Sequence, residues 1–324
     1  MRRPGVRAGT AHLGVRRRGA DANPCSRPQP CLTFAGAFAK TAAYGEMSCL
    51  DPGEFGPLTI TKSVTINCNP RTATVQASGT NSGITVQASA TDAVVIRGID
   101  IETGPNGVGL TALSAASVTI EDSQVGGVNN LTSAGISIQN TGTTKVAIVG
   151  ASVANTYDGI LIAPGSGGIT NASIRRAMVS GSGYDGISTF VEYQSLGVAI
   201  SETASVNNAD AGFDNVVFAN VGANAGIVGA MTIDSSVASA SGSVVPNTGR
   251  GPEFLIEGGG LISAGQGSAI LVANTSATEN SVNAIREPPG PQYSSYGTGF
   301  TFGDNLFDGN TILTPTNFLL APLH

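Results

Sequence analysis

Short phrases that alternate apolar and small polar residues recur along most of the chain. The first phrase recurs as Val64-Thr-Ile66, Val94-Val-Ile96, Val118-Thr-Ile120, Val146-Ala-Ile148, Ala172-Ser-Ile174 and Val198-Ala-Ile200, so that its isoleucines lie 24–30 residues apart. A glycine followed by an apolar residue keeps step with it, at Gly135, Gly159, Gly186 and Gly212, and so does a valine, at Val125, Val153, Val179 and Val206. Alternation over a few residues is typical of a half-buried strand, so each repeat is predicted to contribute three short strands.

A single phrase of this kind cannot bury its apolar face, whereas a stack of coils can, because each coil extends the core of its neighbours. The pattern therefore predicts an all-β solenoid of about ten coils whose strands form three parallel sheets. A helical solenoid would need a periodicity of about 3.6 residues, which these segments lack. A β-sandwich would not explain three phrases that stay in phase.

One amphipathic helix is predicted, over residues 32–43, where it would cover the open end of the first coil. The chain is then divided into four parts. Residues 1–20 are expected to be a disordered or non-native basic leader, 21–63 the N-terminal cap and first strands, 64–285 the coils, and 286–324 a C-terminal loop with the last coil or cap.

The segment before the repeats resembles a known family. It reads Pro30-Cys-Leu-Thr-Phe34, Gly45-Glu-Met47, Pro52-Gly53, Leu58-Thr-Ile60 and Ser63-Val-Thr-Ile66. This pattern is similar to the N-terminal cap of right-handed parallel β-helix proteins of the pectin-lyase-like superfamily. The resemblance implies a single-stranded right-handed parallel β-helix with a capping helix. It does not fix a function, because one fold hosts many chemistries.

The catalytic motifs of that superfamily are mostly missing from this chain. The Gly-His-Gly motif of galacturonan hydrolases is absent, and the only histidines are His12 and His324. The Tyr-Gly-Phe-Asp-Pro-His motif of alginate epimerases is matched only at Gly212, Phe213 and Asp214. The resemblance therefore leaves catalysis open, and an enzyme with this sequence would be a polysaccharide lyase, an epimerase or a glycoside hydrolase.

Charge is unevenly distributed along the chain, whose formal net charge is −6. Residues 1–20 hold six arginines and no acid, and the remainder holds 10 basic and 22 acidic side chains. Because the body has no basic patch, nucleic-acid binding is not expected. No run approaches the 18 or so apolar residues of a membrane span. The leader also lacks the apolar stretch of a secretory signal, so no signal peptide is visible.

All four cysteines lie early in the chain, at Cys25, Cys31, Cys49 and Cys68. Their even number and the lack of a CxxC pair favour disulfides over a zinc site. Three pairings can be drawn, and we favour Cys25–Cys31 with Cys49–Cys68. Disulfides require an oxidising compartment, so a secreted, cell-surface or periplasmic protein is predicted.

The phrase Tyr-Asp-Gly-Ile occurs twice, with Tyr157 and Tyr184 27 residues apart. This offset matches one coil, so Tyr157 should stack on Tyr184, and Asp158 should lie next to Asp185. Two interpretations stay open. The aspartates cap a turn that the tyrosines cover, or the group is a site. Tyrosine rings can cover the apolar face of a sugar, and paired carboxylates can share Ca²⁺.

Three further residues are weaker candidates. Asp210 and Asp214 belong to the next coil and would extend the acidic patch, with Asp210 in substrate binding and Asp214 in catalysis together with Asp158 and Asp185. Arg175 has no evident partner and is a catalytic candidate. Two ion pairs across neighbouring strands are expected, Arg97 with Glu121 and Arg176 with Glu202. No cofactor other than Ca²⁺ is indicated.

The leading hypothesis is an exported β-helix protein that binds or processes a polysaccharide along its rod. The alternative is a non-catalytic structural or adhesion rod of the cell surface. A groove with clustered Tyr and Asp would favour the first, whereas uniform faces of Ser, Thr and Asn would favour the second. The sequence identifies neither the glycan nor the oligomeric state.

Overall fold

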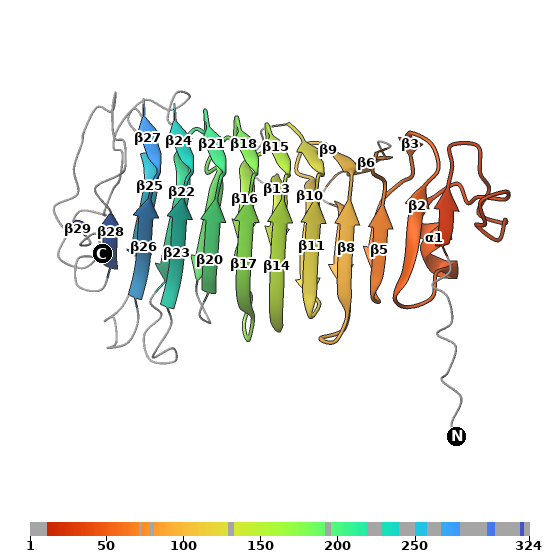
Figure 1. The fold of residues 1–324 in the computed structure, drawn as a ribbon, viewed down its shortest axis with the longest axis horizontal. Coiled ribbons are helices and arrows are strands. Elements are labelled where there is room, and N and C mark those ends of the chain that lie inside the picture. The colour runs from red at the N-terminus through yellow and green to blue at the C-terminus, as the bar shows by residue number, and fades with distance from the viewer. Residues whose placement is uncertain are drawn as a thin grey trace, which may run out of the picture.

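The chain folds into a straight rod of stacked coils that runs from the N-terminal to the C-terminal end (Figure 1). A computed structural model of the chain describes residues 12–70, 73–77, 79, 81–128, 133–191, 196–218, 228–239, 250–257, 267–278, 297–301 and 318–320. All statements about the fold refer to these residues.

Three parallel sheets form the faces of the rod, and over residues 45–257 the described strands visit them in the same order in every coil. The first sheet has twelve strands: β1 His12–Val15, β2 Gly45–Cys49, β5 Val64–Asn67, β8 Ala93–Arg97, β11 Ser117–Glu121, β14 Thr143–Val149, β17 Ile169–Arg175, β20 Leu196–Ser201, β23 Val228–Asp234, β26 Gly267–Ala273, β28 Gly297–Thr301 and β29 Phe318–Leu320.

The other two sheets are shorter. The second has nine strands: β3 Gly53–Glu54, β6 Ala73–Ala77, β9 Ile99–Thr103, β12 Gln124–Gly126, β15 Ser152–Ala154, β18 Met178–Ser180, β21 Ala204–Val206, β24 Val237–Ser239 and β27 Ser276–Thr278. The third has eight: β4 Leu58–Ile60, β7 Ser82–Gln87, β10 Val108–Ser114, β13 Ala134–Ile138, β16 Asp158–Ile162, β19 Ile187–Val191, β22 Ala211–Phe218 and β25 Arg250–Glu257.

The predicted parallel β-helix is confirmed. The repeated phrases pair in register, with Val118 opposite Val94 on one side and Val146 on the other. The described strands complete eight coils of three strands, because the smallest sheet has eight strands. This is slightly fewer than the ten expected. After β25, the strands that are described lie only in the first two sheets.

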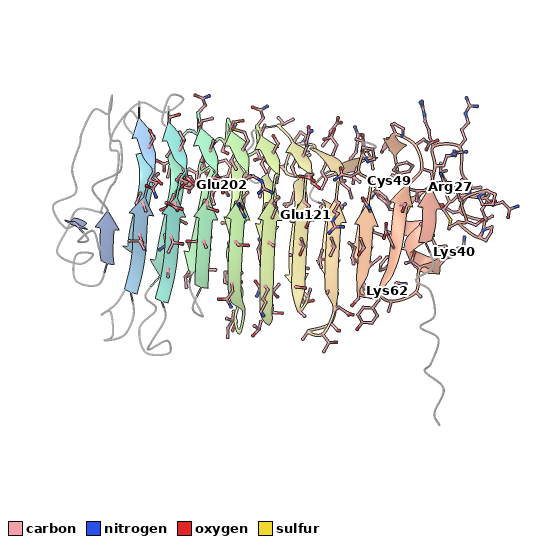
Figure 2. All side chains as sticks on the ribbon, viewed as in Figure 1. Arg27, Lys40, Cys49, Lys62, Glu121 and Glu202 are labelled. Carbon is pink, nitrogen blue, oxygen red and sulfur yellow. A yellow bond between two sulfur atoms is a disulfide. The ribbon has the colours of Figure 1, made fainter. Side chains whose placement is uncertain are left out.

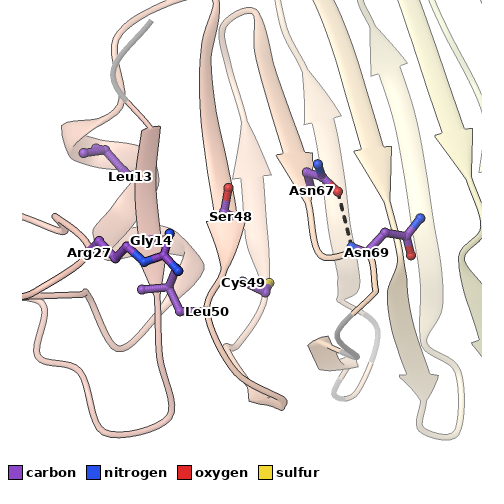
Figure 3. Close-up of a pocket in the computed structure, with 8 residues that line it drawn as sticks. All are labelled: Leu13, Gly14, Arg27, Ser48, Cys49, Leu50, Asn67 and Asn69. Carbon is purple, nitrogen blue, oxygen red and sulfur yellow. Dashed lines mark hydrogen bonds between the residues drawn. The ribbon is translucent and has the colours of Figure 1, made fainter.

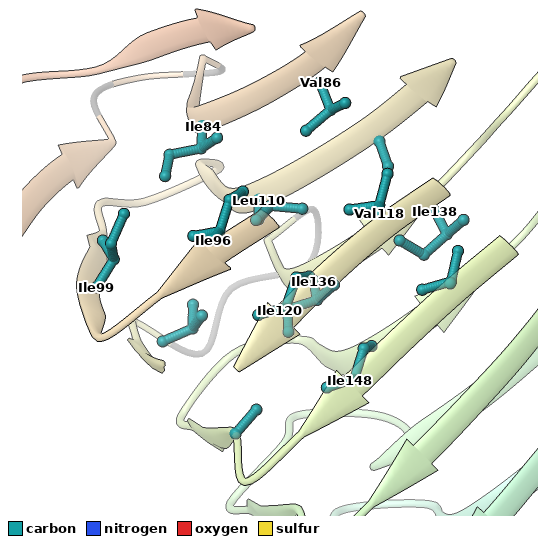
Figure 4. Close-up of a cluster of buried hydrophobic side chains, with 14 of the residues drawn as sticks. Ile84, Val86, Ile96, Ile99, Leu110, Val118, Ile120, Ile136, Ile138 and Ile148 are labelled. Atoms are coloured by element: carbon teal, nitrogen blue, oxygen red, sulfur yellow. The ribbon is translucent and has the colours of Figure 1, made fainter. Parts of the chain in front are cut away.

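The core is one continuous column of aliphatic side chains between the three sheets (Figure 4). Ile96, Ile120 and Ile148 come from successive strands of the first sheet and are at most 1% exposed. Ile136 and Ile138 enter from the third sheet and are fully buried. In the first sheet, the alternation read from the sequence therefore reflects one buried and one outer face of each strand, as in β11 and β17.

A residue in the left-handed conformation turns the chain from the first sheet into the second in seven successive coils. These residues are Gly98, Asp122, Gly150, Arg176, Glu202, Ser235 and Asn274. Five of the seven are not glycine, although glycine is the residue that adopts a positive φ most easily. In the first six of these residues the N–H donates to a backbone carbonyl of the next coil, as that of Asp122 does to Val149 (2.9 Å). These stacked hydrogen bonds stabilise the corner in place of glycine.

A column of glycines lies at the start of the strands of the third sheet, at Gly83, Gly109, Gly135, Gly159, Gly186 and Gly212. Their φ angles are not in the left-handed region. Glycine is needed here because the neighbouring coil approaches the backbone too closely to leave room for a Cβ atom. A Cβ atom placed on Gly135 would lie 2.6 Å from the carbonyl oxygen of Gly159 in the next coil. The repeated glycine before an apolar residue therefore marks tight contact between coils.

The predicted capping helix is α1, Phe34–Lys40, which is shorter than the predicted span of 32–43. The Thr33 side chain caps its N-terminus by accepting a hydrogen bond from the N–H of Gly36 (3.0 Å). Phe34 is fully buried and its ring lies 5.3 Å from that of Phe55. The helix thus covers the first coil, which has no preceding coil to cover it.

The expectation that residues 1–20 form a leader outside the solenoid is wrong for its second half. β1 pairs in parallel with β2, and Val15 is fully buried. Gly14 accepts a backbone hydrogen bond from Cys31 (3.0 Å), so the outer edge of β1 is also paired. The reason is edge protection, because an unpaired β2 would offer free hydrogen-bonding groups to other chains. Residues 1–11 lie outside the described part of the chain.

Both favoured disulfides are confirmed. Cys25 is bonded to Cys31, and Cys49 is bonded to Cys68. The first closes the segment that pairs with β1, and the second joins two neighbouring coils of the first sheet. Within the described residues, no helix has the length and apolarity that a membrane crossing requires.

The C-terminal part, 286–324, is described only in part. Gly297–Thr301 and Phe318–Leu320 extend the first sheet as β28 and β29. The rest of the predicted C-terminal loop lies outside the described residues.

Candidate functional site

Tyr157 and Tyr184 form a stacked pair on the rod, as the 27-residue offset predicted. Their ring centroids are 5.4 Å apart and their planes differ by 6°. Each tyrosine lies just before a strand of the third sheet, and the N–H of Tyr184 donates to the carbonyl of Tyr157 (2.9 Å). Tyr184 is 41% exposed. The pair therefore presents aromatic surface that spans two coils.

The two aspartates of the phrase connect successive coils. The Asp158 carboxylate accepts a backbone hydrogen bond from Asp185, and the Asp185 carboxylate accepts one from the N–H of Ala211 (3.0 Å). Asp158 is half-buried, and Asp185 is 3% exposed. Their hydrogen bonds thus reach the next coil rather than their own turn, which differs from the simple turn cap.

Burial raises the pKa of Asp158 to about 6, and the backbone hydrogen bond from Asp185 only partly offsets this effect. A charged carboxylate that is removed from water is disfavoured relative to its protonated form. Asp158 therefore exchanges its proton close to neutral pH, unlike an ordinary surface aspartate.

Asp210 joins the tyrosine pair, whereas Asp214 belongs to another column of the sheet. The N–H of Asp210 donates to the carbonyl of Tyr184 (3.0 Å). Burial raises the pKa of Tyr157, and the charges of Asp158, Asp185 and Asp210 raise it further. Asp214 lies opposite Ser188, inside the strands, and is 8% exposed. We call Tyr157, Tyr184, Asp158, Asp185 and Asp210 the tyrosine platform.

Arg175 is not free, which corrects its assignment as a residue without a partner. Its guanidinium lies 2.9 Å from the carboxylate of Glu202. The expected pair of Arg176 with Glu202 is wrong, because Arg176 adopts the left-handed corner conformation at φ 51° and Arg175 ends strand β17. The expected pair of Arg97 with Glu121 is confirmed at 2.5 Å. Glu121 and Glu202 lie at the carboxyl ends of first-sheet strands (Figure 2).

A metal site is not assembled by these carboxylates alone. Among the described residues, no three or more His, Cys, Asp or Glu side chains are grouped so that they could hold a metal ion. Asp158 and Asp185 lie in neighbouring coils, but Ca²⁺ prefers six to eight oxygen ligands. The calcium hypothesis therefore has two candidate ligands and stays a prediction.

A pocket that the sequence did not predict lies beside the cap (Figure 3). Its volume is about 280 Å³, and it is lined by Leu13, Gly14, Arg27, Ser48, Cys49, Leu50, Asn67 and Asn69. These residues come from separate segments and share no motif. The strand registers that place Gly14 opposite Ser48 and Ser48 opposite Asn67 bring three of these segments together.

Comparison with solved structures identifies the type of solenoid. Pectate lyase Pel9A superposes with a TM-score of 0.63 at 16% sequence identity, and the match covers 95% of this chain and 78% of that one. The chain has the pectin-lyase-like parallel β-helix fold. A rhamnogalacturonan lyase gives a TM-score of 0.61 at 14% identity, covering 96% of this chain and 86% of that one.

Sequence comparisons add no closer assignment to the β-helix. No protein-family model matches the chain, and no curated protein sequence matches it. Because the structural matches have such low identity, they establish the fold of the β-helix and leave its function to the site.

Proposed function

We propose that this β-helix is an exported protein that binds a polysaccharide on the tyrosine platform. The observation that carries the proposal is the parallel stack of Tyr157 and Tyr184, with ring planes 6° apart. The ring of Tyr184, which is 41% exposed, suits the apolar face of a sugar ring, and Tyr157 supports it from the neighbouring coil. A chain of sugars can then run along the rod and contact successive coils.

The chemistry around the rings supports the same proposal. Carboxylates accept hydrogen bonds from hydroxyl groups, and such charge-assisted bonds are stronger than neutral ones. Asp158 is placed beside Tyr157, where it can bond a sugar hydroxyl. The two solved structures with the same fold are named as a pectate lyase and a rhamnogalacturonan lyase, which are polysaccharide-processing enzymes. The two disulfides support export, since such bonds persist in oxidising compartments.

Processing of the bound glycan would assign a further role to Asp158. A general acid or base works best when its pKa is near the working pH, and burial raises the pKa of Asp158 to about 6. Asp158 is therefore the described residue that we propose to carry a proton, if the β-helix is a lyase, epimerase or glycosidase. An ultraviolet assay for unsaturated sugar products tests the lyase reaction directly.

The binding proposal is tested by a glycan array followed by titration of the best ligand. Tyr157→Ala and Tyr184→Ala should each weaken binding by about tenfold or more, because a central aromatic contact is lost. Tyr44→Ala removes another exposed tyrosine, at the cap and away from the stack, and should leave binding unchanged. Equal binding by the wild type and both platform variants would refute the proposal.

A non-catalytic structural or adhesion rod is the second candidate, and one observation favours it. The outer face of the first sheet carries a shallow groove of about 330 Å³ across β11, β14 and β17, lined mainly by small side chains such as Ser117, Ala147 and Ser173. Apart from Lys145 its lining residues are uncharged, so this face offers contact area with little charge. Binding of whole cells or cell-wall material that persists in Tyr157→Ala would support this candidate.

A further inference from the structure

The pocket beside the cap belongs to neither of the functions proposed above. It lies at β1, β2 and β5 of the first sheet, whereas the tyrosine platform lies several coils farther along the rod, just before strands of the third sheet (Figures 1 and 3). Its volume of about 280 Å³ is close to the lower end of the range of roughly 300–1,000 Å³ that is typical of small-molecule pockets. It therefore fits one small molecule rather than a long polymer.

Arg27 supplies the charge of this pocket. It lies in a turn in which the N–H of Gln29 donates to the carbonyl of Ser26 (3.0 Å), within the loop that the first disulfide closes. Its side chain is exposed to solvent, and its guanidinium is directed toward Leu50 (Figure 3). Among the described residues, this guanidinium has no hydrogen-bond or ion-pair partner. A fork of N–H donors is thus held at the pocket, and its geometry matches a carboxylate or a phosphate.

The other polar side chains of the pocket are neutral. The Asn67 side-chain oxygen accepts a hydrogen bond from the backbone N–H of Asn69 (3.2 Å), which leaves the NH₂ group of Asn67 as a donor. This NH₂ group and the hydroxyl of Ser48 each lie 3.4 Å from the carboxylate of Glu46, outside the pocket lining. The NH₂ group has a second hydrogen to donate. None of the described lining residues is acidic, so a bound anion would meet a cation and neutral donors.

The distribution of charge along the chain favours the same class of ligand. Residues 12–51 contain five Lys or Arg and three Asp or Glu, whereas residues 52–324 contain eight and 19. The cap is therefore the basic end of an otherwise acidic chain. An anion is attracted to the cap more than to the rest of the rod.

We infer that this pocket binds a small ligand that carries a carboxylate or phosphate group, with Arg27 as its main anchor. The guanidinium forms charge-assisted hydrogen bonds with two oxygens of the anion. Asn67 and Ser48 donate to the remaining polar atoms of the ligand, and Leu13 and Leu50 contact its carbon atoms. This binding does not depend on the tyrosine platform.

Calorimetric titration of the full chain can compare glucose, glucuronate and glucose 6-phosphate at neutral pH and low ionic strength. The three share one sugar ring and differ in the group attached to it. Both anions should bind at least about tenfold more tightly than glucose, because a hydrogen bond to a charged group is stronger than one between neutral groups. The tighter of the two identifies whether a carboxylate or a phosphate is preferred.

Three variants test the role of the pocket residues. Arg27→Gln should weaken binding of both anions by about tenfold or more and change that of glucose little. Arg18→Gln removes the same charge from an exposed position of the cap outside the pocket lining, and should change binding by less than about twofold. Glu46→Gln removes the negative charge next to Asn67 and should strengthen binding of the anions by about threefold.

The outcomes distinguish this inference from the proposed function. Equal binding of glucose and the anions, or no binding of any of the three, would overturn the inference. Equal losses in Arg27→Gln and Arg18→Gln would overturn it too, because the general charge of the cap would then account for binding. Tyr157→Ala should leave binding of the anions unchanged, and a loss in that variant would place them on the platform instead.

Discussion

Asp158 links the stability of the protein to pH through one half-buried carboxyl group. Its pKa is raised from 3.8 to about 6 by burial, so the folded protein holds a proton that the unfolded chain releases at lower pH. The fold is therefore favoured by protonation of this residue. The stabilising contribution is complete below pH 3.8 and is lost as the pH rises through about 6.

Asp158→Asn should remove this dependence. At neutral pH the variant should be more stable than the wild type by about 1–3 kcal/mol, since one pKa unit corresponds to about 1.4 kcal/mol. Below pH 3.8 the two proteins should differ little from each other. Urea unfolding at a series of pH values measures the free energy of unfolding of the wild type and of the variant. Glu54→Gln, at an exposed position, should follow the wild type, and a parallel pH profile for Asp158→Asn would contradict the assignment.

Residue-level predictions from the sequence succeeded where the coil length fixed the outcome. The offset of 27 residues was enough to predict that Tyr157 stacks on Tyr184. The arginine that pairs with Glu202 could not be predicted, because the sequence does not show which of Arg175 and Arg176 ends the strand and which occupies the corner. Arg176 takes the positive φ of the corner, so Arg175 is the one that reaches Glu202. The raised pKa of Asp158 likewise depends on burial that no sequence motif encodes.

The glycine column controls how closely neighbouring coils can approach at the third sheet. Gly135→Ala should therefore destabilise the protein by about 1–3 kcal/mol, because its new Cβ would lie 2.6 Å from the carbonyl oxygen of Gly159. Gly126→Ala is the matched control, since a Cβ there meets nothing within 4 Å. Thermal unfolding of both variants measures the difference. Equal midpoints would show that the coils can separate without loss of stability.

The disulfide between Cys49 and Cys68 should stabilise the cap more than the one between Cys25 and Cys31. The two bonds close loops with sequence separations of 19 and 6 residues. Restriction of the unfolded chain predicts about 3 kcal/mol for the longer loop and about 2 kcal/mol for the shorter. Replacing each pair by alanine and measuring the free energy of unfolding tests the order. Four titratable thiols in oxidised protein would contradict both bonds.

Elements were predicted well where a repeat supported them and poorly where none did. The six isoleucine phrases are the strands β5, β8, β11, β14, β17 and β20. The valine phrase fails by one residue at its end, because Val179 pairs with Ser205 rather than with Val206. β1 was missed, since its four residues have no repeat and follow a run of arginine-rich sequence. Its role depends on the β2 edge, which only the assembled cap reveals.

At the scale of the whole rod, the N-terminal end should set much of the resistance to unfolding. Deleting residues 1–15 would remove β1 and expose the edge of β2, and it would leave Cys31 without its backbone partner Gly14. The thermal midpoint should fall by several degrees, with more aggregation. Deleting residues 1–11 keeps β1 and should have a much smaller effect. Equal midpoints for the two deletions would show that β1 is dispensable.

Because neighbouring coils pair in register, the rod can change its length by whole coils while the tyrosine platform stays the same. Val94 lies opposite Val64 on one side and Val118 on the other, so excision of residues 94–117 would bring Val118 directly opposite Val64. The rod would shorten by about 4.8 Å, the spacing of one strand. Both tyrosines lie beyond the excised coil and would keep their mutual geometry. A lineage of such proteins could therefore gain or lose whole coils, and so change its reach from a surface, while preserving what it binds.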